Sequence, residues 1–497
     1  MSRVRPDHLA LRTVAEQAFS RTAGAPLVGG NAIRLLRDAG ENYPAWLDAI
    51  ESARHSVLFE NYIVHDDAVG RRFADALAAR AREGVRVRVI YDWFGCLGTA
   101  SRAFWNRLRD AGAEVRAFNP PRFDSPLGWV SRNHRKSLCV DDRVAFVSGL
   151  CVGQRWVGDP QRGIAPWRDT GVEVRGPAVA DVAQAFARAW AETGGSIPVD
   201  ELPVAAAIAA AGDVELRVLA TIPAVAGLYR LDQLIAALAR ERLWLTDAYF
   251  VGTASYVQAL REAAMDGVDV RLLVPGASDV PIISPITRSG YRPLLEAGVR
   301  VFEWNEPMLH AKTAVADDRW ARVGSSNLNV ASLLGNWELD IATEDARFAA
   351  CMQDAYLADL ERSTEILLVE HNRVRCAGLD GEPVRRRRGG SGGASGVRGS
   401  RGSAGQLATG AMRVGNTFGA AIANRRVLGA AEAKTMVSAG IGLAVVAVLA
   451  VLWPRVLAWP LAALAGWSAA ALLWRVRRLH REAAPPSRGD DPAGGPR

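Results

Sequence analysis

Hydrophobic and polar positions in the first 380 residues follow two periods, one of helices and one of strands, in a regular order. The first part predicts helices over residues 45–54 and 70–82 and strands over residues 56–63, 84–92 and 114–118. A glycine follows the last periodic position of the helix that ends near Gly112, as is typical of a helix C-terminus. Strands that alternate with helices indicate an α/β protein with mixed sheets flanked by helices.

The same order of elements returns in the second part of the chain. The pattern there predicts helices over residues 235–240 and 256–265 and strands over residues 243–250 and 267–274. Gly84 and Gly267 lie 183 residues apart, and Gly112 and Gly298 lie 186 apart. A period near 180 is too long for a solenoid, so we predict two lobes related by a pseudo-twofold axis.

The last hundred residues have a different pattern. Residues 436–453 and 456–474 are two uncharged apolar runs of 18 and 19 residues, separated by Pro454 and Arg455. Each run is long enough to cross a hydrocarbon layer of about 30 Å, with basic residues on both flanks that place both ends in the cytoplasm. We therefore predict a transmembrane helical hairpin; a hairpin that dips into one leaflet and a buried core hairpin are the alternatives.

Composition divides the chain further. The predicted parts are a first lobe (1–200), a second lobe (201–380), a flexible basic Gly/Ser/Arg-rich linker with an amphipathic pattern (381–434), the membrane hairpin (435–480) and a tail (481–497). The five cysteines form no CxxC pair, and residues 1–25 contain no apolar signal sequence. We therefore expect a reducing compartment and no cysteine metal site.

Positive charge is concentrated behind the two lobes. Sixteen arginines and one lysine lie after residue 380 against five acidic residues, a surplus of twelve, while the whole chain carries +7. The first 380 residues therefore carry a net charge of about −5. Proteins that hold nucleic acid show the opposite distribution, so we do not expect a nucleic-acid partner.

Two histidine–lysine pairs stand out because lysine is rare in this chain. Lys136 and Lys312, two of only three lysines, each follow a histidine by two residues, His134 and His310. Positions i and i+2 of a strand point the same way, so each pair presents an imidazole and an ammonium on one face. With the lobes related by a twofold axis, two histidines and two lysines face one cavity. Such a set can transfer a phosphoryl group without a metal or cofactor: the lysines bind phosphate oxygens, one histidine attacks phosphorus and the other serves as acid and base.

The spacing around these pairs resembles the signature of the phospholipase D superfamily: HxK, four residues, D, six residues, GSxN. The second copy matches throughout, with His310, Lys312, Asp317, Ser325 and Asn327. The first copy matches at His134, Lys136 and Asp141 but has Cys151 in place of the asparagine. The resemblance spans residues 30–370, and stretches 60–63, 132–136, 167–170 and 336–338 are similar to bacterial cardiolipin synthases.

The resemblance implies a carboxylate that fixes the tautomer of each histidine, about thirty residues after it. Asp169 lies 35 residues after His134, and Glu338 lies 28 after His310. We therefore expect Asp169 to support His134 and Glu338 to support His310.

The remaining motif residues are four: Asp141, Asp317, Ser325 and Asn327. Asp141 and Asp317 belong to the signature and are counted with the catalytic set, although each opens an Asp–Asp pair typical of turns, which favours a structural role. Ser325 and Asn327 are expected to contact the phosphate.

By the same resemblance His134 is the nucleophile and His310 the acid and base, but pseudo-symmetry leaves this order open. Two further acids, Glu60 and Asp247, lie at matched strand ends in the two halves. They could line the mouth of the site or cap turns, and the sequence leaves both open.

These features together predict a cardiolipin synthase-like phosphatidyltransferase that uses phosphatidylglycerol as donor. The expected location is the bacterial inner membrane, with the catalytic lobes on its cytoplasmic side. The alternatives are a phospholipase D-type phosphodiesterase that uses water, less readily a nuclease, and an inactive lipid-binding protein, which Cys151 would favour. The oligomeric state is left open.

Overall fold

The computed structural model describes residues 17–122, 130–223, 225–280, 283–369 and 373–377, with isolated positions between 452 and 477. The chain forms two compact units, residues 1–119 with 131–433 and residues 120–130 with 434–497, and the fold below is that of the first. The predicted linker, most of the predicted hairpin and the tail lie outside the described residues. Among the described residues, no helix has the length and hydropathy needed to cross a membrane.

Each half of the first unit contains the same series of strands. The first lobe holds β1 (Val28–Arg37), β2 (Ser56–Asn61), β3 (Arg86–Asp92), β4 (Glu114–Phe118), β5 (Ser137–Val140), β6 (Val144–Ser148) and β7 (Thr170–Arg175). The second lobe holds β8 (Val214–Thr221), β9 (Arg242–Thr246), β10 (Asp269–Pro275), β11 (Arg300–Trp304), β12 (Thr313–Ala316), β13 (Trp320–Gly324), β14 (Glu338–Glu344), β15 (Ser363–Val369) and β16 (Arg373–Ala377).

The order of strands confirms the predicted duplication. The first lobe runs β4-β3-β2-β5-β6-β7-β1, and the second runs β11-β10-β9-β12-β13-β14-β8. In both, the first three strands pair in parallel and the others antiparallel, which gives the mixed sheets that the alternating pattern predicts. Strands β1 and β8 join the two halves edge to edge, and β15 and β16 extend the second half.

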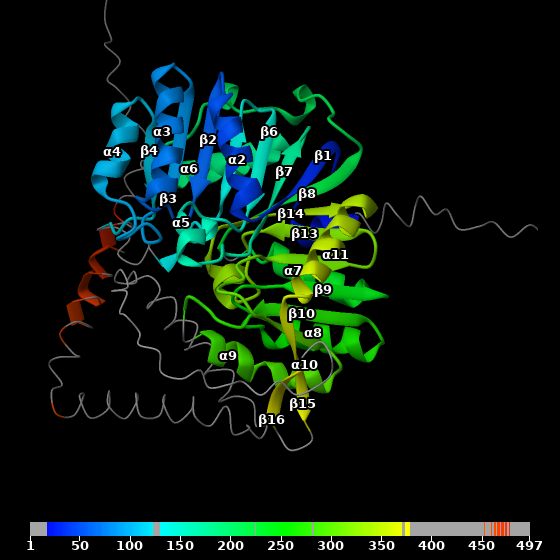
Figure 1. The fold of residues 1–497 in the computed structure, drawn as a ribbon. Helices are drawn as coiled ribbons and strands as arrows, with labels where there is room; N and C mark the ends of the chain where they lie inside the picture. Colours follow the sequence, from blue (N-terminus) through cyan, green and yellow to red (C-terminus); the bar gives the residue numbers. More distant parts are fainter. Residues whose placement is uncertain are drawn as a thin grey trace, which may run out of the picture. The chain divides into compact units, whose positions relative to one another are not determined.

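Helices cover these sheets in matching positions (Figure 1). They are α2 (Asp38–Glu51), α3 (Ala68–Arg82), α4 (Arg102–Asp110), α5 (Gln154–Val157) and α6 (Val179–Glu192) in the first lobe, and α7 (Gly227–Leu238), α8 (Ala254–Met265), α9 (Ile283–Ser289), α10 (Tyr291–Glu296) and α11 (Ala346–Leu360) in the second. One apolar core lies under α2, α3 and α4 and another under α7, α8 and α10.

A third apolar core holds the two lobes together. It combines Val147 and Val172 of the first sheet with Val323 and Ile341 of the second, and α6 contributes Phe186. Burial of apolar surface is the main favourable term in folding, so this shared core fixes how the lobes meet. The active-site segments of both lobes come together beside it.

Candidate active site

Backbone hydrogen bonds tie each histidine segment to the opposite lobe. The segment before β5 pairs with the residue before β14: the His134 N–H donates to the Trp337 carbonyl at 2.9 Å, and the Trp337 N–H to the Arg132 carbonyl at 2.7 Å. The segment before β12 pairs in the same way with the residue before Asp169: the His310 N–H donates to the Arg168 carbonyl at 2.7 Å. The two histidine–lysine pairs are therefore brought together, as the duplication predicts.

The carboxylates that hold the histidines cross between the lobes. His134 Nδ1 lies 2.9 Å from Glu338, and His310 Nδ1 lies 2.7 Å from Asp169. The expected pairing within each half is therefore wrong. The reason is the backbone pairing described above. Glu338 follows Trp337, which is bonded to the His134 segment, and Asp169 follows Arg168, which is bonded to the His310 segment. Both carboxylates and both histidine rings are buried.

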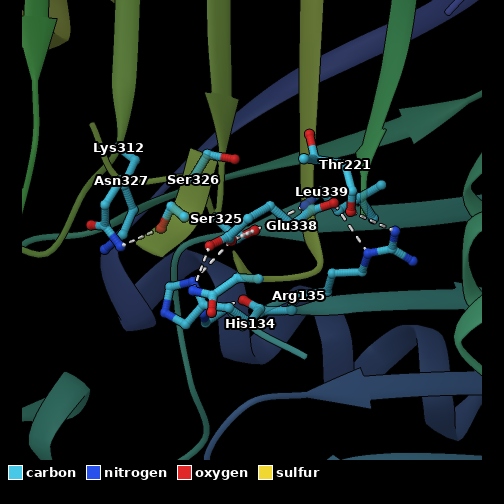
Figure 2. A network of polar contacts seen from close by, with 12 residues as sticks. His134, Arg135, Thr221, Lys312, Ser325, Ser326, Asn327, Glu338 and Leu339 are labelled. Atoms are coloured by element: carbon cyan, nitrogen blue, oxygen red, sulfur yellow. Dashed lines mark hydrogen bonds and ion pairs between the residues drawn. The ribbon is translucent and has the colours of Figure 1, made fainter. Parts of the chain in front are cut away.

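Each carboxylate is in turn held by further donors. Glu338 accepts from the Ser325 hydroxyl at 2.6 Å and from the Asn336 amide at 3.2 Å (Figure 2). Asp169 accepts from the Trp156 indole N–H at 3.2 Å. When a carboxylate is ionised it can only accept hydrogen bonds, and Nδ1 of a neutral ring beside it then carries the proton while Nε2 keeps its lone pair.

The two lysines lie beside the histidines, fully buried. Each ammonium donates to the main-chain carbonyl of its own histidine, and the rings of Tyr62 and Tyr249 lie 5.1 and 5.7 Å from Lys136 and Lys312. Burial lowers the pKa of Lys136, and it lowers that of Lys312 to about 8 against the attraction of Asp169. Two buried ammonium groups that interact electrostatically can attract a phosphate.

The protonation of His310 follows from the same surroundings. Burial, and then the charge of Lys312, lower the pKa of His310 to about 4. Burial alone would raise the pKa of Asp169, but His310 and Lys312 together hold it below its usual value. Burial keeps the pKa of Glu338 raised, although Lys136 opposes it. In the unliganded protein His310 is therefore neutral at pH 7.

Asp141 and Asp317 lie at the far ends of β5 and β12, away from the histidines. Asp141 accepts from the backbone N–H groups of residues 54, 55 and 56 at 2.7–2.8 Å, and Asp317 accepts from those of residues 240, 241 and 242. Both have positive φ, 52° and 49°, in a tight turn. The geometry contradicts their place in the catalytic set and confirms the structural role: each carboxylate anchors the start of the neighbouring strand.

The residues at the end of each signature differ in what they contact. The Ser325 hydroxyl donates to Glu338 and accepts from the Leu339 N–H, so it positions the carboxylate that holds His134. Asn327 donates to Ser332 at 3.5 Å, and its buried Oδ1 has no hydrogen-bond partner among the described residues. The Cys151 thiol is buried and lies within electrostatic range of both lysines.

Glu60 and Asp247 are both buried and hydrogen-bonded. Glu60 accepts from the Asn133 amide at 2.6 Å and the Ser137 hydroxyl at 3.0 Å. Asp247 accepts from the backbone N–H groups of Tyr249 and Leu328 at 2.9 and 2.7 Å. Both fix loops next to the site.

Sequence reasoning missed three residues that shape the site. Trp156, on the short helix α5, had no signal in the sequence pattern. Buried Arg135 donates to the carbonyls of Glu338 (3.1 Å), Thr221 (3.2 Å) and Ala185 (2.8 Å), which links β14 to β8 and α6 (Figure 2). Its place between His134 and Lys136 was visible, but its contacts span distant segments.

Buried Arg168 is the third such residue. Its Nε donates to Asp359 of α11 at 2.8 Å, and its Nη1 to Asp38 at 3.2 Å. The Asp169 N–H also donates to Asp38, at 2.8 Å. The carboxylate that holds His310 is thus fixed to helices of both lobes.

Within the described ranges, no three or more His, Cys, Asp and Glu side chains are grouped so as to hold a metal ion.

Comparisons with known proteins agree with this geometry. A family model described as cardiolipin synthase, PLD-like domain, matches residues 46–190 and 232–360. Cardiolipin synthase A of Pseudomonas fluorescens (strain SBW25) is 33% identical over 369 residues, which cover 72% of this chain and 74% of the relative. Cardiolipin synthase A of Pseudomonas aeruginosa (strain LESB58) is 35% identical over 367 residues, 72% and 73% of the two chains.

A solved structure shows the same fold at low sequence identity. The phosphatidylserine synthase of Haemophilus influenzae Rd KW20 superimposes with a TM-score of 0.56 at 14% identity, over 71% of this chain and 92% of that one. The matched family segments coincide with the two lobes and include both histidine–lysine pairs. The chain therefore belongs to the cardiolipin synthase, PLD-like domain family of the phospholipase D superfamily.

Proposed function

We propose that the protein is a phosphatidyltransferase that moves a phosphatidyl group from phosphatidylglycerol to the hydroxyl of a second phospholipid, through a phosphohistidine. One observation carries this proposal: two histidines, each held at Nδ1 by a buried carboxylate, lie beside two buried lysines. The names of the matched relatives, cardiolipin synthases, support a phosphatidyl donor.

In the first step His134 acts as the nucleophile. Its Nε2 lone pair attacks the phosphorus of phosphatidylglycerol, the bond from phosphorus to the glycerol headgroup oxygen breaks, and His310 gives a proton to that oxygen. Lys136 and Lys312 stabilise the negative charge on the non-bridging oxygens. Glu338 stabilises the positive charge that develops on the His134 ring. Glycerol leaves, and a phosphatidyl-histidine remains.

In the second step His310 acts as the base. It removes the proton from the hydroxyl of the second phospholipid, whose oxygen attacks phosphorus while the bond to His134 Nε2 breaks. One ring therefore changes between acid and base while the other carries the group, as microscopic reversibility requires of a double displacement.

Protonation of His310 is coupled to substrate binding in this scheme. In the free enzyme burial and the nearby lysine charge lower the pKa of His310 to about 4. A bound phosphodiester adds negative charge beside the lysines and so raises that pKa. The proton needed for the leaving glycerol is therefore taken up together with the substrate.

We extend the proposal to the membrane. The apolar runs 436–453 and 456–474 with their basic flanks support a hairpin that anchors the two lobes, residues 1–200 and 201–380, on the cytoplasmic side of a bacterial inner membrane. The basic linker 381–434 supports contact with anionic lipid, at about 1 kcal/mol for each basic residue near the surface.

The deciding experiment incubates the purified full chain with vesicles of labelled phosphatidylglycerol and follows the products. We expect diphosphatidylglycerol together with free glycerol. Phosphatidic acid as the only product would replace the transferase with a hydrolase. Absence of any turnover of lipid would leave a lipid-binding protein, and cleavage of single-stranded DNA without lipid turnover would overturn the lipid assignment.

A further inference from the structure

The two half-sites differ at the position of the signature asparagine. The second half has Asn327, and the first half has Cys151 in its place. Burial raises the pKa of the Cys151 thiol, so it stays protonated next to the lysines. A neutral thiol is a weak hydrogen-bond partner, so the half-site of His134 lacks the amide that the other half has.

The strand register identifies another amide in the half-site of His134. Strands β2 and β5 pair Glu60 with Ser137 at the end of their ladder. The same register, continued by one residue, sets Asn61 opposite Lys136. Side chains of directly opposite residues share one face of a sheet and lie close together. Asn61 is thus the cross-strand neighbour of the lysine.

The other half fixes which residue matches Asn61. Strands β9 and β12 pair Thr246 with Thr313, which places Asp247 opposite Lys312. Asp247 therefore corresponds to Asn61 and not, as the sequence suggested, to Glu60. A shift of one residue moves a side chain to the other face of the sheet, so this correction changes which residue faces the lysine.

Asn61 and Asp247 are used differently. Asp247 accepts from the Leu328 N–H and so holds the loop that follows Asn327. In the first half the matching N–H, that of Val152, donates to the Ile63 carbonyl at 3.0 Å instead. The main chain fixes the loop there, and the Asn61 side chain is not needed for it.

The Asn61 amide has no hydrogen-bond partner in the part of the chain that the structure describes. The side chain is 1% exposed, and neither its Nδ2 nor its Oδ1 forms a hydrogen bond with a described residue. Among the buried asparagines in the described ranges, it is the one whose two amide atoms both lack a partner, while Asn42 and Asn327 each lack a partner at Oδ1 alone. A buried polar group without a partner is unfavourable, and a group that binds substrate is one explanation for keeping it.

We propose that Asn61 supplies the amide of the His134 half-site: its Nδ2–H donates to an oxygen of the phosphate bound between Lys136 and Lys312. In this half the amide thus comes from the neighbouring strand β2, while Cys151 stands at the end of the signature. This inference rests on the proposed function, because it names a substrate contact of the same site.

The test measures binding of inorganic phosphate to the full chain by titration calorimetry, together with thermal unfolding. Asn61→Leu keeps the volume and removes the unpartnered amide, so we expect the Kd for phosphate to rise at least tenfold while the melting temperature stays equal or rises. Asn61→Asp keeps the shape and adds a negative charge, and should weaken phosphate binding further. Asn327→Leu is the matched variant of the other half.

A rescue variant separates a phosphate contact from a packing role. Cys151→Asn restores the signature amide, so the double variant Asn61→Leu/Cys151→Asn should recover most of the phosphate affinity lost by Asn61→Leu alone. A Kd within twofold of wild type for both Asn61→Leu and Asn61→Asp, or weaker binding that is matched by a lower melting temperature and is not rescued, would overturn the proposal.

Phosphate binding also keeps this inference distinct from the proposed function. If wild type makes no diphosphatidylglycerol but loses phosphate affinity on Asn61→Leu, the transferase proposal fails and the role of Asn61 stands. If wild type makes diphosphatidylglycerol and Asn61→Leu binds phosphate as wild type does, Asn61 alone is wrong.

Discussion

The half-site of His134 and the half-site of His310 each contain a histidine, a lysine and a carboxylate. They differ in the hydrogen-bond donors that hold the carboxylate. Glu338 accepts a hydrogen bond from the Ser325 hydroxyl, whereas Asp169 accepts one from the Trp156 indole N–H. Gly149 stands where Ser325 stands in the other half, and a Cβ there would come within 2.1 Å of Asp169 Oδ1. The twofold relation thus preserves histidine, lysine and carboxylate, while the donors behind them have diverged.

The electrostatic surroundings have diverged as well. The His310 ring packs against Trp156, Trp167 and Tyr249 with ring centroids 5.8–5.9 Å apart, and its pKa lies near 4. Its carboxylate has a lowered pKa, whereas that of Glu338 is raised. Two histidines in unlike surroundings are suited to different tasks, which is what a nucleophile and an acid–base partner require.

The largest expected effect comes from the histidines themselves. His134→Ala and His310→Ala should each lower turnover of phosphatidylglycerol by about a thousandfold or more, because each removes one of two essential groups. Survival of either variant near the wild-type rate would contradict the two-histidine mechanism.

The phosphorus adduct separates the two roles. With phosphorus-labelled lipid, mass spectrometry of quenched enzyme should find the label on His134 and never on His310. Label on His310 would exchange the roles assigned to the two half-sites.

The crossed carboxylates give the next largest effect. Glu338→Gln should slow formation of the phosphohistidine on His134 by about a hundredfold or more, because the amide no longer fixes the tautomer or stabilises the ring charge. This is expected although Glu338 lies in the second lobe. Rapid-quench measurement of the labelled enzyme tests it.

Asp169→Asn is the matched variant of the other half. Asp169→Asn should slow the proton transfer from His310 to the leaving glycerol. The rate of this variant should therefore depend strongly on the pKa of the leaving alcohol, and the rate of Glu338→Gln should depend on it less. Double-variant cycles should show coupling between His134 and Glu338 and between His310 and Asp169. Coupling within each half instead would contradict the crossed arrangement.

A smaller effect concerns pH. Lysine is charged below its pKa, and burial lowers the pKa of Lys312 to about 8, so the ammonium is lost as pH rises through 8. Because His310, with a pKa of about 4, takes up its proton with the substrate, we expect kcat/KM to decrease already as pH rises toward 8. Loss of the Lys312 charge should add a further fall of up to about tenfold per pH unit above 8. In Lys312→Arg the charge persists, so the fall should move to higher pH even if the rate is lower. An unchanged fall in that variant would assign it to another group.

The smallest effects belong to the motif aspartates. Asp141→Asn and Asp317→Asn should each lower the free energy of unfolding by about 2 kcal/mol, because a carboxylate that accepts several backbone N–H groups is replaced by an amide. Activity per folded molecule should stay within a few-fold. Asp142→Asn is the control, with a change of about 0.5 kcal/mol or less in urea unfolding. A thousandfold loss of activity in Asp141→Asn would return it to the catalytic set.

The order of helices and strands and the histidine–lysine pairs could be predicted from the sequence. The pairing between segments distant in the chain could not. The repeated order of strands and helices is fixed by periodicity and by glycines that need positive φ, such as Gly112 (99°) and Gly298 (93°), so the duplication was predictable. The histidines and lysines were predictable because strand geometry places i and i+2 together. Which carboxylate holds which histidine depends on how two lobes dock, and spacing along the chain does not contain that.

The same limit explains the other errors. The predicted correspondence of Glu60 with Asp247 is wrong by one residue, since Asn61 corresponds to Asp247. The positions of strand ends in the sequence do not determine the register of pairing. Trp156 was invisible because one indole on a four-residue helix leaves no periodic pattern. Asp141 was recognisable as a turn residue from its Asp–Asp pair, but the backbone groups of residues 54–56 that it accepts from are distant in the sequence and were not predictable.

The crossing of Glu338 and Asp169 has a consequence for how such a chain changes over generations. Two copies of one lobe, related by a twofold axis, would build the same crossed pairs, each copy completing its neighbour's histidine. In such a symmetric pair, every substitution is imposed on both half-sites at once. When both halves lie on one chain, a cysteine can occupy position 151 while position 327 remains asparagine. The two halves of the site can then take on different catalytic roles.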